Sequence, residues 1–403
     1  MKKPCRSIPR FWIPGAGTAL ALLLGFLASA SLMAEDEPTS GWAYGSRGWE
    51  WSNLDTGSYI WGGLRFQTRY SNRVDDPLIS DDLRQEGREG LSMNRARYKI
   101  GAAFGRHLTA YHEYDLRNGQ LLDLRATWKA SPKFNLRFGQ WKTEYNRERI
   151  DSSGKQQFVD RSIANYWFTL DRQNGVMASG RLMAEQAGDS TWYLGVLNGN
   201  GLNTGGDGGR PLVVGRWQWN FTRSVLPFSQ SALKRFNPAR GALVVGFASN
   251  DSPYTRFSSN GGGQLPGYEK GTDNQYRIDQ LMLEFAWQRF GLSLQSEAHF
   301  KTIEDRKSGA SNDLYGGYLQ GGWFPADRYP NWPEQLELAA RIAFVAPDDA
   351  ISKFNNREFS LASNWFFNGH RNKLTADLSY LEISDLQGET DGFRFRVQWD
   401  ISL

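Results

Sequence analysis

The sequence has almost no cysteine and no long apolar run after its first 30 residues. Cys5 is the single cysteine among 403 residues, and it lies in a segment that we expect to be removed. The remaining chain is therefore predicted to have no disulfide, no thiol nucleophile and no cysteine-ligated metal. Outside the N-terminus, no segment approaches the ~20 consecutive apolar residues that a membrane-spanning helix needs. The sequence thus gives no sign of a disulfide scaffold or of a spanning helix.

The N-terminus has the pattern of a secretory signal peptide. Four basic residues between Lys2 and Arg10 precede an apolar run at 16–30, which is too short to span a membrane. Ala30 and Ala34 offer two cleavage sites, and the pattern does not choose between them. This leader contains four of the 47 Lys and Arg residues and none of the 43 Asp and Glu residues. The rest of the chain therefore has no formal net charge, and charge gives no reason to expect a nucleic-acid partner.

Aromatic residues are abundant and fall in alternating patterns. They make up 14% of the chain, 16 of them tryptophan, although the mean hydropathy is negative. In Phe393–Leu403 every odd position is apolar and every even position is polar, and a strand with this period shows one apolar and one polar face. In a soluble protein the apolar face would meet a core. The same pattern is typical of the last strand of an outer-membrane barrel, with lipid outside and a wet lumen inside.

Sixteen such alternating segments follow one another along the chain. They begin near Tyr59, Leu91, His107, Leu121, Lys133, Gly175, Thr191, Pro211, Gly241, Gln275, Gly291, Asp313, Gln335, Arg357, Asn372 and Gly392. Connections after odd-numbered segments tend to be long and those after even-numbered ones short, as in outer-membrane barrels; 118–120 and 223–240 are the exceptions. We predict an all-β, transmembrane antiparallel barrel of 16 strands at 59–403. A signal peptide at 1–34 and a short periplasmic segment at 35–58 would precede it.

The polar parity of several strands places basic residues in the lumen. The residues concerned are Arg65 and Arg69 on the first strand, Arg95, Arg97 and Lys99 on the second, Arg125 on the fourth, and Arg394 and Arg396 on the last. Neighbours on one face lie about 6.5–7 Å apart, so an anion can pass from one cation to the next. Carboxylates are expected in the same lumen: Glu113, Asp115, Glu284, Glu337 and Asp400. Charge location, rather than net charge, must therefore decide ion preference.

Three stretches carry a family resemblance. Residues 138–153, 158–162 and 171–176, together with Asn94-Arg-Ala-Arg97, resemble the phosphate-selective porin O and P family, with Asn94 where that family has a first arginine. The resemblance implies a sixteen-stranded barrel, a homotrimer, and a third outer loop folded inward as a constriction. It also implies arginines that lead to the constriction and lysines beyond it, which bind and pass phosphate or polyphosphate. By position, Arg65, Arg95 and Arg97 match the ladder region, and Lys142, Arg149, Lys155 and Arg161 fall in or beside the constriction loop.

The expected function is passive diffusion of small inorganic anions through a bacterial outer membrane. No cofactor is implied because diffusion needs none, and the partners are outer-membrane lipid and lipopolysaccharide. A general diffusion porin without a binding site is the alternative. A Ser-His-Asp hydrolase on the barrel wall would need a histidine on the lipid face, where the parity places His112. The acidic pairs 75–76 and 81–82 fit no known metal loop, so we expect no metal site and a solvated loop there.

Overall fold

The computed structural model describes residues 40–45, 47–72, 90–206, 208–258, 263–265, 268, 270–347, 355–385 and 388–403. The expected signal peptide and the acidic pairs of the first outer loop lie outside the described residues. In the part of the chain that is described, no helix is both long and apolar enough to span a membrane.

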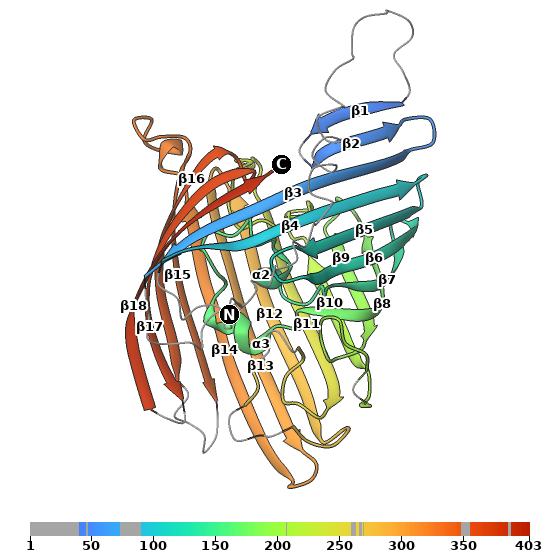
Figure 1. Ribbon diagram of the computed structural model, residues 1–403, viewed down its shortest axis with the longest axis vertical. Helices are drawn as coiled ribbons and strands as arrows, with labels where there is room; N and C mark the ends of the chain where they lie inside the picture. Colours follow the sequence, from blue (N-terminus) through green and yellow to red (C-terminus); the bar gives the residue numbers. More distant parts are fainter. Residues whose placement is uncertain are drawn as a thin grey trace, which may run out of the picture. The chain divides into compact units, whose positions relative to one another are not determined.

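A closed antiparallel barrel of sixteen strands forms the protein, as the alternating pattern predicted. Each strand pairs with the next along the chain, and the last, β18, pairs with the first, β3, from Arg396–Ser71 to Ser402–Arg65. In Figure 1, β3 (blue) lies between β4 (cyan) and β18 (red). The strands are β3 Ser58–Ser71, β4 Gly90–Phe104, β5 Leu108–Asp115, β6 Gln120–Ser131, β7 Phe134–Lys142, β8 Arg172–Leu182, β9 Ser190–Leu197, β10 Leu212–Trp219, β11 Arg240–Ser252, β12 Tyr276–Arg289, β13 Leu292–Asp305, β14 Ala310–Trp323, β15 Leu336–Pro347, β16 Asn356–Asn368, β17 Asn372–Asp385 and β18 Gly388–Ser402. Every strand begins within four residues of its expected start.

A hairpin precedes the barrel in the region where no strand was expected. It consists of β1 (Ser40–Gly45) and β2 (Gly48–Asn53), which pair with each other. β2 then pairs with the first part of β3, from Asn53–Ser58 to Trp49–Gly62, whereas β18 pairs with the second part of the same edge. The hairpin thus extends the sheet where β3 runs past the end of β18.

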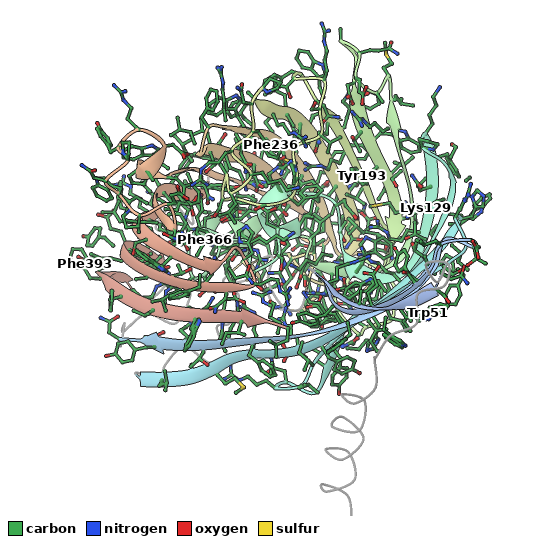
Figure 2. All side chains as sticks on the ribbon, turned by 90° about the horizontal axis from the view of Figure 1, so that it is seen from above. Trp51, Lys129, Tyr193, Phe236, Phe366 and Phe393 are labelled. Atoms are coloured by element: carbon green, nitrogen blue, oxygen red, sulfur yellow. The ribbon has the colours of Figure 1, made fainter. Side chains whose placement is uncertain are left out.

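Side-chain alternation in the strands follows the expected parity. In β18, Phe393, Phe395 and Trp399 are exposed, while Arg394 and Arg396 are buried on the inner face. Figure 2 shows Phe393 at the outer edge of the ring of strands and the buried Phe366 within it.

One expectation of parity is wrong. Leu122 shares the even parity of the exposed Leu124 and Trp128, which predicts an outward side chain, but it is 4% exposed. The register of β5 and β6 shifts between Glu113 and Tyr114, so that Leu122 is the extra residue of a bulge. A bulged residue leaves the alternation of its strand, and parity cannot be counted through it.

Short helical segments lie in two of the connections between strands. The connection from β7 to β8 contains the helices α2 (Arg147–Ile150) and α3 (Ile163–Phe168), and α3 packs against β14, β15 and β16. The connection from β10 to β11 spans 220–239, and the one from β14 to β15 includes the 3-10 helix η1 (Pro325–Asp327). The connection from β13 to β14, expected to be long, has only four residues, 306–309.

Candidate functional site

The β7–β8 connection, residues 143–171, is held by carboxylates on one half of the barrel wall. We call it the inner loop, and the four strand residues that accept its backbone N–H groups the acidic wall. The bonds run from Arg147 to Glu284 (3.1 Å), Glu148 to Glu297 (2.7 Å), Val159 to Asp377 (3.0 Å) and Ile163 to Glu358 (3.0 Å). These strand residues belong to β12, β13, β17 and β16 and are buried. Their charges are therefore used to fix the inner loop within the barrel.

The basic residues of the inner loop mostly hold the loop together. Arg149 forms an ion pair with Asp171 at the loop's own end. Arg161 donates to the backbone carbonyls of Glu148 (2.8 Å) and Asp151 (3.0 Å), where it satisfies the carbonyl end of α2. Lys155 differs because its side chain is exposed. Of these three expected ligands, two are thus engaged in internal contacts.

Burial raises the pKa of two carboxyl groups of the inner loop, Glu148 and Asp151. Burial raises the pKa of Glu148 to about 8, with Arg341 opposing the shift and Glu297 adding to it. Burial likewise raises the pKa of Asp151 to about 7, against the attraction of Arg147, and neither of its carboxylate oxygens has a hydrogen-bond partner among the described residues. In its position against the acidic wall, the inner loop therefore favours the neutral form of the Glu148 and Asp151 carboxyl groups.

The β10–β11 connection meets the inner loop inside the barrel. Its residue Gln230 accepts a bond from the Gln157 N–H (2.8 Å) and donates its own N–H to the Lys155 carbonyl (3.1 Å). Phe228 lies 4.7 Å from the Arg147 guanidinium, and Ser231 donates to Glu337 on β15 (2.8 Å). The β10–β11 connection, which is too long for an ordinary turn, therefore occupies part of the lumen together with the inner loop.

Three inward cations stand on the half of the wall formed by β4, β6 and β7. Lys99, Arg125 and Lys142 form no ion pair with any described residue, and all three are partly exposed. Lys142 donates to the Asp151 carbonyl at 3.4 Å, and the Arg125 guanidinium lies 4.9 Å from the Tyr111 ring. We call this group the cationic wall. Glu113 of β5 lies opposite Lys99, but it forms an ion pair with Arg97.

The remaining expected lumen arginines have partners. Arg65 donates to Asp400 (2.8 and 2.9 Å) and also to Ser152 and Ser153 of the inner loop (3.2 Å each). Arg97 pairs with Asp115 (3.2 Å) and Glu113 (3.3 Å). Arg95 donates to Gln67 (2.7 Å). The ladder residues thus point inward as expected, but most are tied to neighbouring groups.

Arginines gather around one carboxylate of the inner loop. Asp160 pairs with Arg69 (3.0 Å) and Arg396 (2.6 Å). Burial opposes the charge of Asp160, but Arg69, Arg396, Arg95 and Arg394 outweigh it and hold its pKa below the usual range. Arg396 is shared with Asp377 (2.7 Å). Four guanidinium groups around one loop carboxylate create a second region of positive potential in the lumen.

Several inward basic residues were not among the expected site residues. They are Arg172, Arg216, Lys301, Arg341 and Lys373, all buried. The alternation that identified Arg95 and Arg97 is present in their strands too. In β15, for example, Arg341 lies between the exposed Leu338, Ile342 and Phe344. Applying the parity to every strand would have found these residues, whereas their ion pairs depend on contacts distant in sequence.

Comparisons with known proteins agree with this architecture. No curated protein matches the sequence. A solved structure of OmpT with loop L8 deleted, an outer membrane protein of Vibrio cholerae, is similar with a TM-score of 0.59 and 9% identity, covering 86% of this chain and 99% of that chain. An anion-selective porin from Comamonas acidovorans has a TM-score of 0.51 and 12% identity, over 86% and 99% of the two chains. The outer membrane channel DcaP of Acinetobacter baumannii has a TM-score of 0.51 and 8% identity, over 86% and 97%.

At these identities the solved structures show a shared fold. The profile of the family described as phosphate-selective porin O and P matches residues 66–391, which include fourteen complete strands of the barrel, β4 to β17, and the inner loop. The chain is therefore a porin of the outer membrane and belongs to the phosphate-selective porin O and P family.

Proposed function

We propose that this porin is a passive channel that prefers small anions. The observation that carries the proposal is the cationic wall: Lys99, Arg125 and Lys142 face the lumen without an ion pair among the described residues. Carboxylates on the other half of the barrel are occupied with the backbone of the inner loop. An ion that passes between the two halves meets fixed positive charge with little local compensation. Such charge attracts anions and repels cations, most strongly where water is scarce.

The expected binding of phosphate or polyphosphate is part of this proposal. The guanidinium groups around Asp160 would gather anions on the approach, and Lys99, Arg125 and Lys142 would hold them weakly enough to release them. Conduction requires several binding sites of moderate affinity rather than one site of high affinity, because a tightly bound ion would not leave. Lys suits release because its ammonium is a compact, strongly hydrated charge, whereas Arg binds two oxygens of one anion at once.

One observation favours the alternative of a general anion preference without a phosphate site. Arg65 and Arg97 are already paired with Asp400, Asp115 and Glu113. A guanidinium that holds a carboxylate is not free to bind phosphate in a bidentate manner. The two functions differ in saturation: conductance in phosphate should level off with concentration if a site exists, and should rise linearly if none does.

The preference for anions is tested by neutralising the cationic wall. The triple variant Lys99→Gln, Arg125→Gln and Lys142→Gln should lose several-fold of the anion-to-cation permeability ratio, measured as the zero-current potential of single channels in a KCl gradient. Arg289→Gln is the control because Arg289 is exposed at the end of β12, on the same outward parity as Leu281 and Leu283. An unchanged ratio in the triple variant would contradict the proposal.

A homotrimer is the second part of the proposal. On the outer face of β4 and β5, the Tyr98 hydroxyl lies 3.1 Å from His112 Nε2, and the Tyr98 and Tyr114 rings stack with centroids 5.7 Å apart. Hydrogen-bonding groups near the middle of a spanning strand are costly against lipid, so this face suits contact with a second copy of the chain. OmpT of Vibrio cholerae is a solved relative in fold that is described in a trimer form. Cross-linking in detergent and sizing of the product test the assembly.

A further inference from the structure

A row of aromatic residues lines the inner face of the wall beside the cationic wall. Strand pairing places Trp61 of β3 opposite Gly101 of β4, Gly101 opposite Tyr111 of β5, and Tyr111 opposite Arg125 of β6. All four positions share one row and one face. The centroids of Trp61 and Tyr111 are 6.0 Å apart, and the guanidinium of Arg125 lies 4.9 Å from the Tyr111 ring.

Glycine at position 101 makes the row possible. A Cβ at Gly101 would collide with the indole ring of Trp61, so the indole lies across the backbone of β4 toward Tyr111. Because Gly101 has no side chain, the rings of Trp61 and Tyr111, on separate strands, form one continuous surface. The same site includes the Lys99 ammonium, which lies one step along β4 on the same face, opposite Gly63 and Glu113, and forms no ion pair among the described residues.

Aromatic rings on the lumen face have no obvious role in passing inorganic ions. Trp61 and Tyr111 are only partly buried, and a water-filled pathway gives no reason to expose them. Inorganic phosphate is compact and hydrated and gains nothing from a ring face. A planar organic anion makes two favourable interactions here: its ring can stack on aromatic or guanidinium groups, and its carboxylate can contact a cation. Few convergent polar groups beside an apolar surface are typical of sites for small organic ligands.

We propose that Trp61, Tyr111, Arg125 and Lys99 form a binding site for aromatic carboxylates on the permeation pathway. The indole and phenol rings with the Arg125 guanidinium supply the stacking surface, and Lys99 supplies the charge that meets the carboxylate. The Arg47 guanidinium, 5.7 Å from the Trp61 ring, and the Glu113 carboxylate, which accepts from the Tyr111 hydroxyl (2.8 Å), border the site. The site rests on the proposed anion preference and gives it a substrate class.

Benzoate and inorganic phosphate are the probes of this site. Each is added to single channels that carry chloride current in a planar bilayer, and the half-blocking concentration is measured. Benzoate should block at lower concentration than cyclohexanecarboxylate, which has the same charge but no planar ring. Trp61→Leu should raise the half-blocking concentration of benzoate by about three- to tenfold, the range expected for loss of one aromatic contact, and that of phosphate by less than about twofold. Gly101→Ala should act in the same direction by displacing the indole.

Trp128→Leu is the matched control, because Trp128 is exposed on the outer face of β6. Folding of every variant is checked by the heat-dependent mobility shift of the barrel on gels. Equal loss of benzoate and phosphate block in Trp61→Leu would overturn the aromatic site, as would equal block by benzoate and cyclohexanecarboxylate. A wild-type channel that does not favour chloride over potassium would instead contradict the proposed function itself, so the two failures are distinguishable.

Discussion

Removing one carboxylate of the acidic wall should loosen the inner loop without unfolding the barrel. Glu297 accepts bonds from the Glu148 N–H (2.7 Å), from Asn146 Nδ2 (3.1 Å) and from His299 (3.1 Å). It is the best choice because no arginine pairs with it among the described residues, so its removal strands no partner charge. Glu297→Gln keeps the size of the side chain but replaces one carboxylate oxygen, an acceptor, with an NH2 group, a donor. The loop donors Glu148 N–H and Asn146 Nδ2 then compete for a single acceptor oxygen.

The magnitude follows from the bonds that are lost. A hydrogen bond to a charged group contributes about 1.5–3 kcal/mol, and about 1.4 kcal/mol is a tenfold change in an equilibrium constant. The displaced form of the inner loop should therefore become roughly ten- to a hundredfold more populated. Because the loop occupies part of the lumen, displacement should appear as transitions to a larger conductance and as greater noise in single-channel records.

The control for this prediction lies on the same strand. Glu304 of β13 is exposed, and Glu304→Gln should leave the records as they are in the parent. Heat-dependent gel mobility should be normal in both variants, because strand pairing is untouched. Records of Glu297→Gln that match the parent in conductance and noise would refute the role of the acidic wall in holding the loop.

Further perturbations test the loop, its second support and the outer face. Raising the pH from about 6 to about 9 ionises Glu148 and Asp151, whose pKa values in the inner loop are about 8 and about 7. Both values are raised, so the loop in this position favours the protonated carboxyls and becomes less stable as the pH rises through this range. Conductance noise should therefore grow with pH. The variant Glu148→Gln with Asp151→Asn should lose this dependence. Gln230→Ala leaves the Gln157 N–H without its acceptor, at a cost of about 1–3 kcal/mol, and should also enlarge the conductance, whereas an unchanged trace would remove the β10–β11 connection from the constriction. Tyr98→Arg places a charge on the outer face at a cost of about 2–4 kcal/mol and should lower the yield of folded barrel on gels, while Lys99→Glu should not; equal yields would contradict the assigned faces.

The strands could be predicted because alternation is a local property. Phe393–Leu403 shows its two faces without reference to the rest of the chain, and the structure confirms them. Alternation fails only where the backbone departs from regular pairing, as at the bulge that buries Leu122. The hairpin β1–β2 was missed although Trp42 and Tyr44 alternate with small residues and Trp49 and Trp51 follow the same period. Two strands of six residues give a weak pattern beside strands of fourteen.

Much of the candidate site could not be predicted from sequence, because its contacts join residues far apart in the chain. Parity indicated that Arg65, Arg97 and Lys99 face inward, but it could not show which of them would find a carboxylate. Arg65 meets Asp400 across more than 300 residues, whereas Lys99 meets no ion-pair partner among the described residues. The roles therefore divide in a way that residue type does not reveal: several arginines hold carboxylates, whereas Lys99, Lys142 and Arg125 form no ion pair among the described residues.

The proposal that this porin prefers anions is tested most directly by the zero-current potential of the unmodified protein. Single channels in a planar bilayer are placed between concentrated and dilute KCl, and the voltage at which current vanishes is measured. The uncompensated charges of Lys99, Arg125 and Lys142 predict the sign that corresponds to chloride moving more readily than potassium. A potential of zero, or one with the sign of potassium preference, would contradict the proposal.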